Sequence, residues 1–227
     1  ADDVPYNMHT GSNASWSRDG KHIYYGQTDA VDLQGRKVKR PPADNVQFSK
    51  DEYVQGPIRI TKEMCSRLSP HRKLLDAQPA TIRNPKWSPD HRTFMIGYSN
   101  EYENPETLER RVPTVKELYL IDADGKNFRR LDDYAHHHSW LADSKNIIFA
   151  GHDGLVVETA DGKSRRVISK VTGTHPSVSP QGTLVVTDIY TAKGDYLALI
   201  HVKDGRVEKL VNTPRTHPRN HKQTHTH

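Results

Sequence analysis

The sequence has little apolar, aromatic or sulfur-containing material. Hydrophobic residues make up 33% of the 227 residues, aromatic residues make up 7%, and Cys65 is the single cysteine. One cysteine excludes an internal disulfide framework. No apolar run approaches the roughly 18 residues of a membrane-spanning helix, so we expect no membrane partner. No apolar pattern of helical spacing persists along the chain either, so helices should be few.

The charge balance is basic. The chain has 33 Lys and Arg against 28 Asp and Glu, a formal net charge of +5. A positive field raises the local concentration of an anionic ligand, so we expect an anionic partner. No motif that reads RNA or DNA is present, so nucleic acid is not the expected partner. The sequence also lacks the G-x-S-x-G turn of a serine hydrolase, which disfavours a peptidase.

A short pattern recurs four times along the chain. Each copy has an aromatic residue or valine, then a polar turn, then a β-rich run, and the turn often carries Asp-Gly or a similar pair. Such pairs favour tight hairpin turns, because glycine accepts positive φ and Asp tolerates it. The four copies are Ser12–Gly26, Asn84–Tyr98, His137–Gly151 and His175–Ile189.

A second hairpin follows each of the last three copies. These hairpins span Leu118–Leu131, Leu155–Ile168 and Tyr196–Leu210. Two hairpins per unit give four strands, the composition of a β-propeller blade. The pattern therefore predicts an all-β fold, with one β-propeller domain over residues 1–227 that holds about four four-stranded antiparallel blades and the start of a fifth. The pattern stops where a fifth blade should begin, and the chain ends on candidate ligands, so we expect a chain that is incomplete.

Two segments interrupt the repeat. The first, Gly35–Glu63, is expected to be an insertion, and its basic run of Arg36, Lys37, Lys39 and Arg40 is expected to be a solvated loop. The second, Asn100–Thr114, is expected to be a long loop, and loops at a propeller face often carry function.

Histidines concentrate in the second half of the chain, where ten of the 14 lie from His136 onward. At the end of the chain Gln223, His225 and His227 alternate with threonines. In an extended segment these three side chains point to the same side. One amide oxygen and two imidazoles suit a divalent metal with mixed N and O ligands. A solvated polar tail or part of a purification tag are the alternative interpretations.

The repeated hairpins resemble those of TolB-like β-propellers. His137 three residues before Trp140, His175 in GTHPSVSPQG and the terminal Gln/His cluster further resemble the oligogalacturonate lyase family, seven-bladed propellers among the polysaccharide lyases. The resemblance implies a lyase that cleaves short, pectin-derived uronate oligosaccharides with a divalent metal, Mn above others. It implies His137 as the general base, with His136 and His138 as competitors.

The same resemblance implies the metal ligands His175, Gln223, His225 and His227. The family has its Gln three residues before the first His of the pair, where this chain has Lys222, so Gln223, His221 and the Lys222 position remain alternatives.

The family's substrate-binding Arg precedes the strand that matches Leu118–Ile121. Here the candidates for binding the uronate are Arg110, Arg111 and Lys116. A cytoplasmic or periplasmic location fits, with the cytoplasm favoured.

The implied chemistry explains why such residues are needed. β-Elimination on a uronate removes the C5 proton, which is weakly acidic because the neighbouring carboxylate is already negative. A divalent cation on that carboxylate stabilises the charge that develops. A neutral imidazole then accepts the proton. The alternative hypothesis is a non-catalytic TolB-like propeller that binds a protein or glycan partner.

Overall fold

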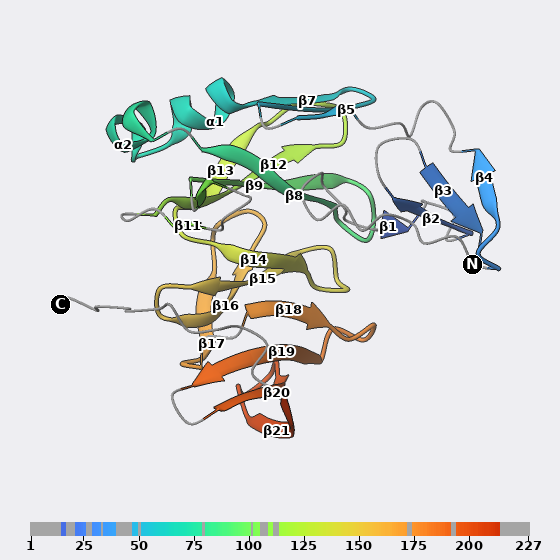
Figure 1. The fold of residues 1–227 in the computed structure, drawn as a ribbon, viewed down its shortest axis with the longest axis vertical. Helices are drawn as coiled ribbons and strands as arrows, with labels where there is room; N and C mark the ends of the chain where they lie inside the picture. The colour runs from blue at the N-terminus through green and yellow to red at the C-terminus, as the bar shows by residue number, and fades with distance from the viewer. Residues whose placement is uncertain are drawn as a thin grey trace.

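The computed structural model describes most of the chain. The residues described are 15–16, 21–25, 29–32, 34–39, 47–49, 51–78, 80–100, 102–104, 109–110, 114–171, 174–191 and 194–213. Within these ranges the strands form four four-stranded antiparallel sheets, one three-stranded sheet and one two-stranded sheet (Figure 1). The all-β prediction is therefore confirmed.

Each four-stranded sheet is one blade. The first contains β1 (Ser15–Trp16), β2 (His22–Tyr25), β3 (Asp29–Asp32) and β4 (Lys37–Lys39). The second contains β8 (Thr81–Trp87), β9 (Thr93–Ser99), β12 (Lys116–Asp122) and β13 (Arg129–Asp132). The third contains β14 (His136–Trp140), β15 (Asn146–Gly151), β16 (Gly154–Thr159) and β17 (Arg165–Ser169). The fourth contains β18 (Thr174–Val178), β19 (Leu184–Thr191), β20 (Gly194–His201) and β21 (Val207–Thr213).

The first predicted interruption has more regular structure than expected. It contains β5 (Gln47–Phe48), β6 (Glu52–Gln55) and β7 (Ile58–Thr61), which form a three-stranded sheet, and α1 (Lys62–Leu68) and α2 (Arg72–Ala77) follow. Ile58 and Ile60 alternate with polar residues and are fully buried, which is the pattern of a strand with one buried face. The overall composition of the segment does not show this alternation. Thr61 Oγ1 then accepts a hydrogen bond from Met64 N at 3.3 Å, which caps α1.

Two further expectations about loops were wrong in part. The basic run does not form a loop throughout, because Lys37–Lys39 is β4, although Arg36 and Lys37 are exposed as expected. Tyr102–Asn104 (β10) and Glu109–Arg110 (β11) pair as a short hairpin inside the segment expected to be a loop. Both strands are only two or three residues long, so a period-2 pattern had too few positions to be recognised.

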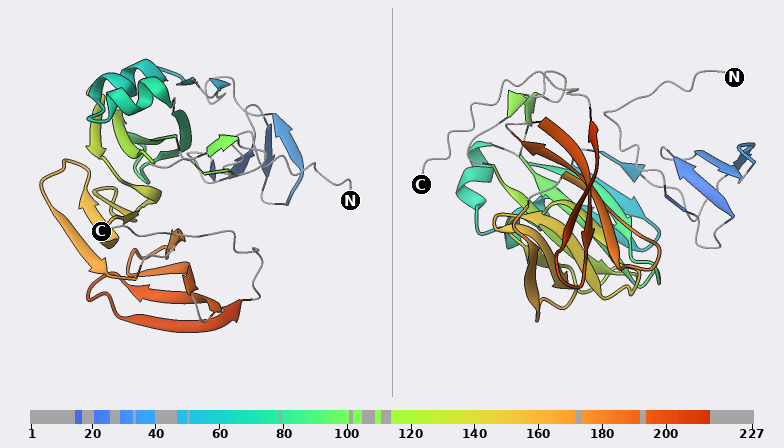
Figure 2. Two further views of the ribbon diagram at one scale, coloured as in Figure 1. Left: turned by 60° about the vertical axis from the view of Figure 1, so that its left-hand side comes forward. Right: turned by 90° about the horizontal axis from the view of Figure 1, so that it is seen from below.

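Apolar side chains between neighbouring sheets hold the second, third and fourth blades together. One core joins the second and third blades and includes Met95, Leu118 and Phe149. Another joins the third and fourth blades and includes Ile148 and Val185. The second, third and fourth blades follow one another along an arc, which the left view of Figure 2 shows. Sheets packed in this way bring their first strands to one side of the arc.

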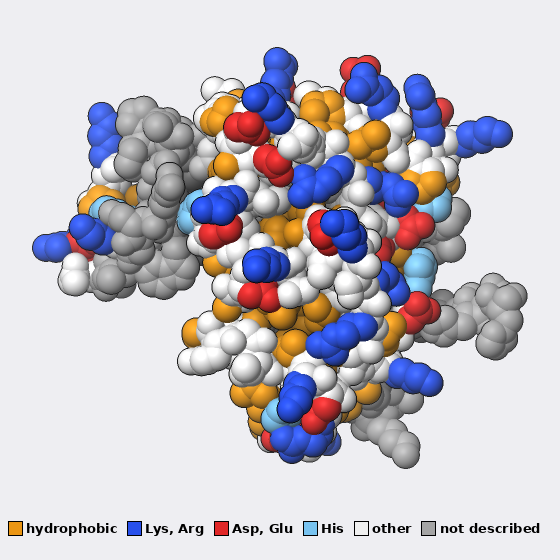
Figure 3. Space-filling model, turned by 180° about the vertical axis from the view of Figure 1, so that it is seen from behind, with side chains coloured by type: hydrophobic (Ala, Val, Ile, Leu, Met, Phe, Trp, Pro, Cys, Tyr) orange, Lys and Arg blue, Asp and Glu red, His pale blue; other side chains and the backbone are white. Residues whose placement is uncertain are grey.

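The outer surface carries no single basic patch on the face drawn in Figure 3. Lys and Arg side chains are spread over that face, and Asp and Glu lie between them (Figure 3). Elsewhere among the described residues, too, Lys and Arg side chains pair with acids, such as Arg129 with Asp122 at 3.1 Å. The net positive charge therefore does not by itself indicate where an anionic ligand would bind.

The first strands of the second and third blades are joined by polar contacts, which we call the β8–β14 junction. Lys86 Nζ donates to the carbonyl of His138 at 2.7 Å, and Trp140 Nε1 donates to the carbonyl of Lys86 at 3.4 Å. His138 Nε2 lies 3.1 Å from the carbonyl of Asn84. A carbonyl only accepts, so Nε2 carries the proton of a neutral His138. Burial, and then the nearby Lys86 ammonium, lower the pKa of His138 to about 3.

The β8–β14 junction predicts a loss of stability in acid. An unfolded His138 takes up a proton below its reference pKa of about 6.5, whereas the folded one stays neutral until about pH 3. The free energy of unfolding therefore falls as the pH falls through this window, by about 2 kcal/mol at pH 5 from this group.

We expect His138→Gln to remove most of this dependence, because its amide keeps a donor near Asn84 and does not titrate. Urea unfolding at pH 7 and pH 5 measures the difference. Equal changes in stability for the variant and the original protein would contradict the assignment.

Candidate functional site

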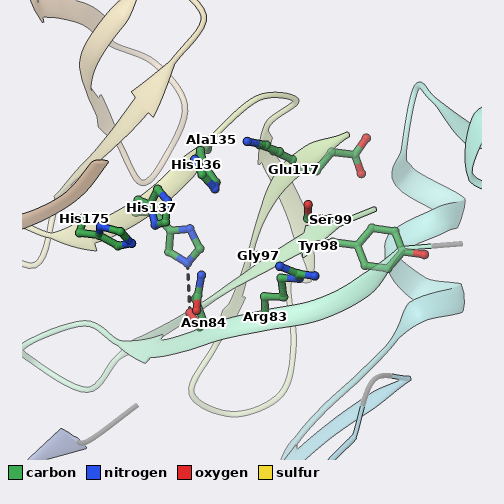
Figure 4. A pocket seen from close by; sticks show the side chains of 12 residues that line it. Arg83, Asn84, Gly97, Tyr98, Ser99, Glu117, Ala135, His136, His137 and His175 are labelled. Carbon is green, nitrogen blue, oxygen red and sulfur yellow. Dashed lines mark hydrogen bonds between the residues drawn. The ribbon is translucent and has the colours of Figure 1, made fainter. Parts of the chain in front are cut away.

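An open pocket of about 240 Å³ lies where the first strands of the second, third and fourth blades approach one another (Figure 4). Three blades contribute side chains to it, and imidazoles form one side of its wall. The lining residues are Arg83, Asn84, Gly97, Tyr98, Ser99, Lys116, Glu117, Ala135, His136, His137, His138 and His175.

The same backbone feature brings each blade to this pocket. Asn84, His137 and His175 have positive φ values of 49°, 50° and 54°. At each of them the pairing with the next strand shifts register, as a β-bulge does. Asn and His enter this region of φ more readily than most residues. A bulge re-aims the side chains around it, so one device places three equivalent side chains at one pocket.

The bulge residues have a common position in the sequence. Each lies three residues before the residue that anchors its hairpin, namely Trp87, Trp140 and Val178. His137 and His175 were predicted from the family resemblance, which for His137 rested in part on this spacing to Trp140. The spacing also applied to Asn84, which we did not predict as a site residue although the signal was present.

The structure brings the two predicted histidines together. The ring centroids of His137 and His175 are 4.2 Å apart, and those of His136 and His137 are 3.6 Å apart. His137 and His175 are 38 residues apart in the chain, on the first strands of adjacent blades. Their roles as base and metal ligand stay predictions, because their proximity alone does not assign either role.

His175 has a carboxylate partner. Its Nδ1 lies 3.2 Å from Asp188 Oδ2, on the neighbouring strand β19. The His175 side chain is 66% exposed, whereas that of Asp188 is 22% exposed. The imidazole of His175 is therefore exposed at the pocket surface and contacts a partly shielded carboxylate.

Lys116 and Glu117 form the wall on the side of β12. Lys116 is 8% exposed, and its ammonium lies 5.6 Å from the centre of the Tyr134 ring. Glu117 is fully buried and accepts hydrogen bonds from Ser69 Oγ and Tyr119 Oη, both at 2.5 Å. Burial raises the pKa of Glu117. Since Ser69 is the C-cap residue of α1, Glu117 ties this helix to the strand that carries Lys116.

The remaining predicted site residues are not placed. Arg110 lies in β11, but its side chain is outside the described residues. Outside them as well are Arg111, His221, Lys222, Gln223, His225 and His227. Arg83, which lines the pocket, was not predicted, because a single Arg inside a strand gives no signal in the sequence.

The described residues include no group of three or more His, Cys, Asp or Glu side chains that could hold a metal ion. The donor types present do suit a transition metal, since imidazoles of His137 and His175 lie side by side at the pocket. A complete ligand set would need further donors from elsewhere in the protein. In the part of the chain that is described, no helix has the length and apolarity to cross a membrane.

The sequence matches no protein-family model and no curated protein. The fold is nevertheless similar to solved β-propellers. The match to TolB from Acinetobacter baumannii covers 88% of this chain and 43% of TolB, with a TM-score of 0.51 and 13% identity.

Two oligogalacturonate lyases are also similar. The match to one in complex with manganese covers 88% of this chain and 64% of the lyase, with a TM-score of 0.50 and 17% identity. The match to one from Vibrio parahaemolyticus covers 87% and 64%, with a TM-score of 0.51 and 17% identity. This chain thus spans 43% to 64% of the length of these three proteins. At such identities the likeness shows the fold alone, a β-propeller like that of the TolB-like group.

Proposed function

We propose that this chain is part of a metal-dependent lyase that cleaves oligogalacturonides by β-elimination, acting in the cytoplasm or the periplasm. The observation that carries the proposal is the pair His137 and His175, which equivalent bulges on adjacent blades place 4.2 Å apart at an open pocket. A solved oligogalacturonate lyase of similar fold is in complex with manganese, which supports this choice of reaction and metal.

In this proposal the two histidines have different tasks. His175, together with Gln223, His225 and His227, would hold the metal. A divalent metal bound there supplies positive charge to the uronate carboxylate and so makes the C5 proton more acidic. His137 accepts that proton as a neutral imidazole. Lys116, in the pocket wall, adds positive charge on the side of β12, which favours an anionic sugar.

The contacts of the three consecutive histidines support His137 as the base in preference to His138. His138 is 3% exposed, its Nε2 proton is committed to the Asn84 carbonyl, and its pKa is lowered to about 3. Such an imidazole is a poor proton acceptor. His136 and His137 are both half-buried in the pocket wall, and His137 is the one beside His175. These contacts favour His137 over His138.

One observation favours the second candidate, a non-catalytic TolB-like propeller that binds a protein or glycan. TolB from Acinetobacter baumannii is among the solved proteins of similar fold. This candidate requires no metal and no base. It predicts that substitutions of His137 and His175 leave ligand binding intact.

The proposed reaction forms an unsaturated uronate that absorbs ultraviolet light. With trigalacturonate and added Mn²⁺, we expect absorbance to rise in the presence of the protein and to stop rising when a chelator is added. The protein should first be shown to be folded by circular dichroism and to be loaded with Mn²⁺. A folded, loaded protein that produces no absorbance would contradict the lyase assignment.

The different roles proposed for His137 and His175 predict that substituting each of them has a different effect. His137→Ala should lower kcat by about 10²- to 10⁴-fold, the usual contribution of a general base, without weakening Mn²⁺ binding. His175→Ala should weaken Mn²⁺ binding, measured by electron paramagnetic resonance of the free ion. His152→Ala is a control, because His152 stacks on Tyr134 outside the group of lining residues. Loss of Mn²⁺ binding in His137→Ala would show that His137 is a ligand instead.

A further inference from the structure

The fourth blade differs from its neighbours at one position of its second strand. Across the ladder, Gly97 pairs with Arg83 in the second blade and Ala150 pairs with His136 in the third. In the fourth blade the same position, opposite Thr174, is Asp188. The three positions are equivalent because each faces the residue just before the bulge. A carboxylate therefore stands behind the bulge residue in the blade of His175, where the other blades have no side chain or a methyl group.

The contact between Asp188 and His175 selects one tautomer. Asp188 Oδ2 lies 3.2 Å from Nδ1 of His175, and an ionised carboxylate only accepts hydrogen bonds. Nδ1 must therefore carry the proton, and in the neutral ring Nε2 then keeps its lone pair. A carboxylate that accepts from the second ring nitrogen in this way orients many metal-binding histidines and raises their basicity.

The partial shielding of the carboxylate strengthens this contact. The Asp188 side chain is 22% exposed, so its charge is less screened than that of a fully solvated carboxylate. The ring that it holds is 66% exposed and is the part that reaches the pocket. The partly shielded carboxylate of Asp188 thus orients the exposed imidazole of His175.

We propose that Asp188 is a positioning residue that locks His175 as the Nδ1-protonated tautomer, so that Nε2 offers its lone pair to an electron-pair acceptor in the pocket, a divalent transition metal. The proposal rests on the proposed function for the identity of that acceptor. The fixed tautomer of His175 depends only on its contact with Asp188.

The contact with Asp188 also distinguishes the blade of His175 from the blade of the neighbouring His137. His175 has a carboxylate from the second strand of its own blade, whereas Ala150 supplies none at the equivalent position of the blade of His137. A carboxylate can orient either a metal-ligating imidazole or a general base. The difference between Asp188 and Ala150 therefore shows that the second strand of the fourth blade supplies a carboxylate to its bulge histidine and that the equivalent position of the third blade does not.

Asp188→Ala tests the lock without metal. Alanine is the residue that the third blade has at this position, so the strand should accept it. We measure the tautomer of His175 from the ¹⁵N chemical shifts of its ring in metal-free protein, at a pH well above the imidazole reference pKa of about 6.5. The original protein should show the Nδ1-protonated form, and the variant should show a mixture in which the Nε2-protonated form dominates.

Metal binding supplies the second readout. In Asp188→Ala the affinity for Mn²⁺ should fall about 10- to 100-fold, the usual effect of removing such a partner. Glu208→Gln is the matched control, because it changes a similar carboxylate–imidazole contact, to His201 Nε2 at 2.8 Å, at the other end of the same blade. The control should leave the His175 spectrum and the Mn²⁺ affinity unchanged.

The outcomes separate the two proposals. An unchanged His175 tautomer in folded Asp188→Ala overturns the positioning role, whatever the metal does. If the tautomer changes but the original protein binds no Mn²⁺, the lock stands and the metal-dependent function fails. If the tautomer changes and Mn²⁺ affinity stays the same, His175 is not held for the metal and the positioning proposal is overturned in that respect.

Discussion

The β-bulge in the first strand of each blade is the constraint on which the pocket depends. In an unbroken strand the side chains alternate strictly between two faces. At Asn84, His137 and His175 the backbone enters the positive-φ region and the pairing slips, so the alternation is broken at the same place in three blades. The side chains of these residues line one pocket for that reason. The pocket is therefore a property of the repeat, and the chemistry comes from which residue each blade places there.

The bulge also explains how three consecutive histidines have two different environments. His136 and His137 lie half-buried in the pocket wall, whereas His138 is fully buried and binds the Asn84 carbonyl of the preceding blade. The buried one joins two blades and stays neutral, because a charge there would be desolvated next to the Lys86 ammonium. A single HHH run thus holds the second and third blades together and, through its first two members, presents imidazoles to the pocket.

The segment before the second blade supports the opposite wall. Ser69, the C-cap residue of α1, donates to Glu117, and Tyr119 donates to the same carboxylate. The strands of this segment pack apolar residues such as Ile58 and Ile60 against the second blade. Lys116 is adjacent to Glu117 on β12, so the position of this cation depends on the packing of a segment that is separate from the repeat.

The sequence by itself determined the local features of this protein. Hairpin turns and period-2 alternation involve residues a few positions apart, so the blades, their four strands and the common position of His137 and His175 were all predictable. Short strands such as β10 and the helix α1, whose cap and apolar contacts are found only in context, were not. Arg83 gave no signal, because its place at the pocket depends on neighbouring blades. The 4.2 Å approach of His137 to His175 and the carboxylate of Asp188 behind one ring were decided only by the tertiary structure, since they require blade packing and strand register that no local pattern specifies.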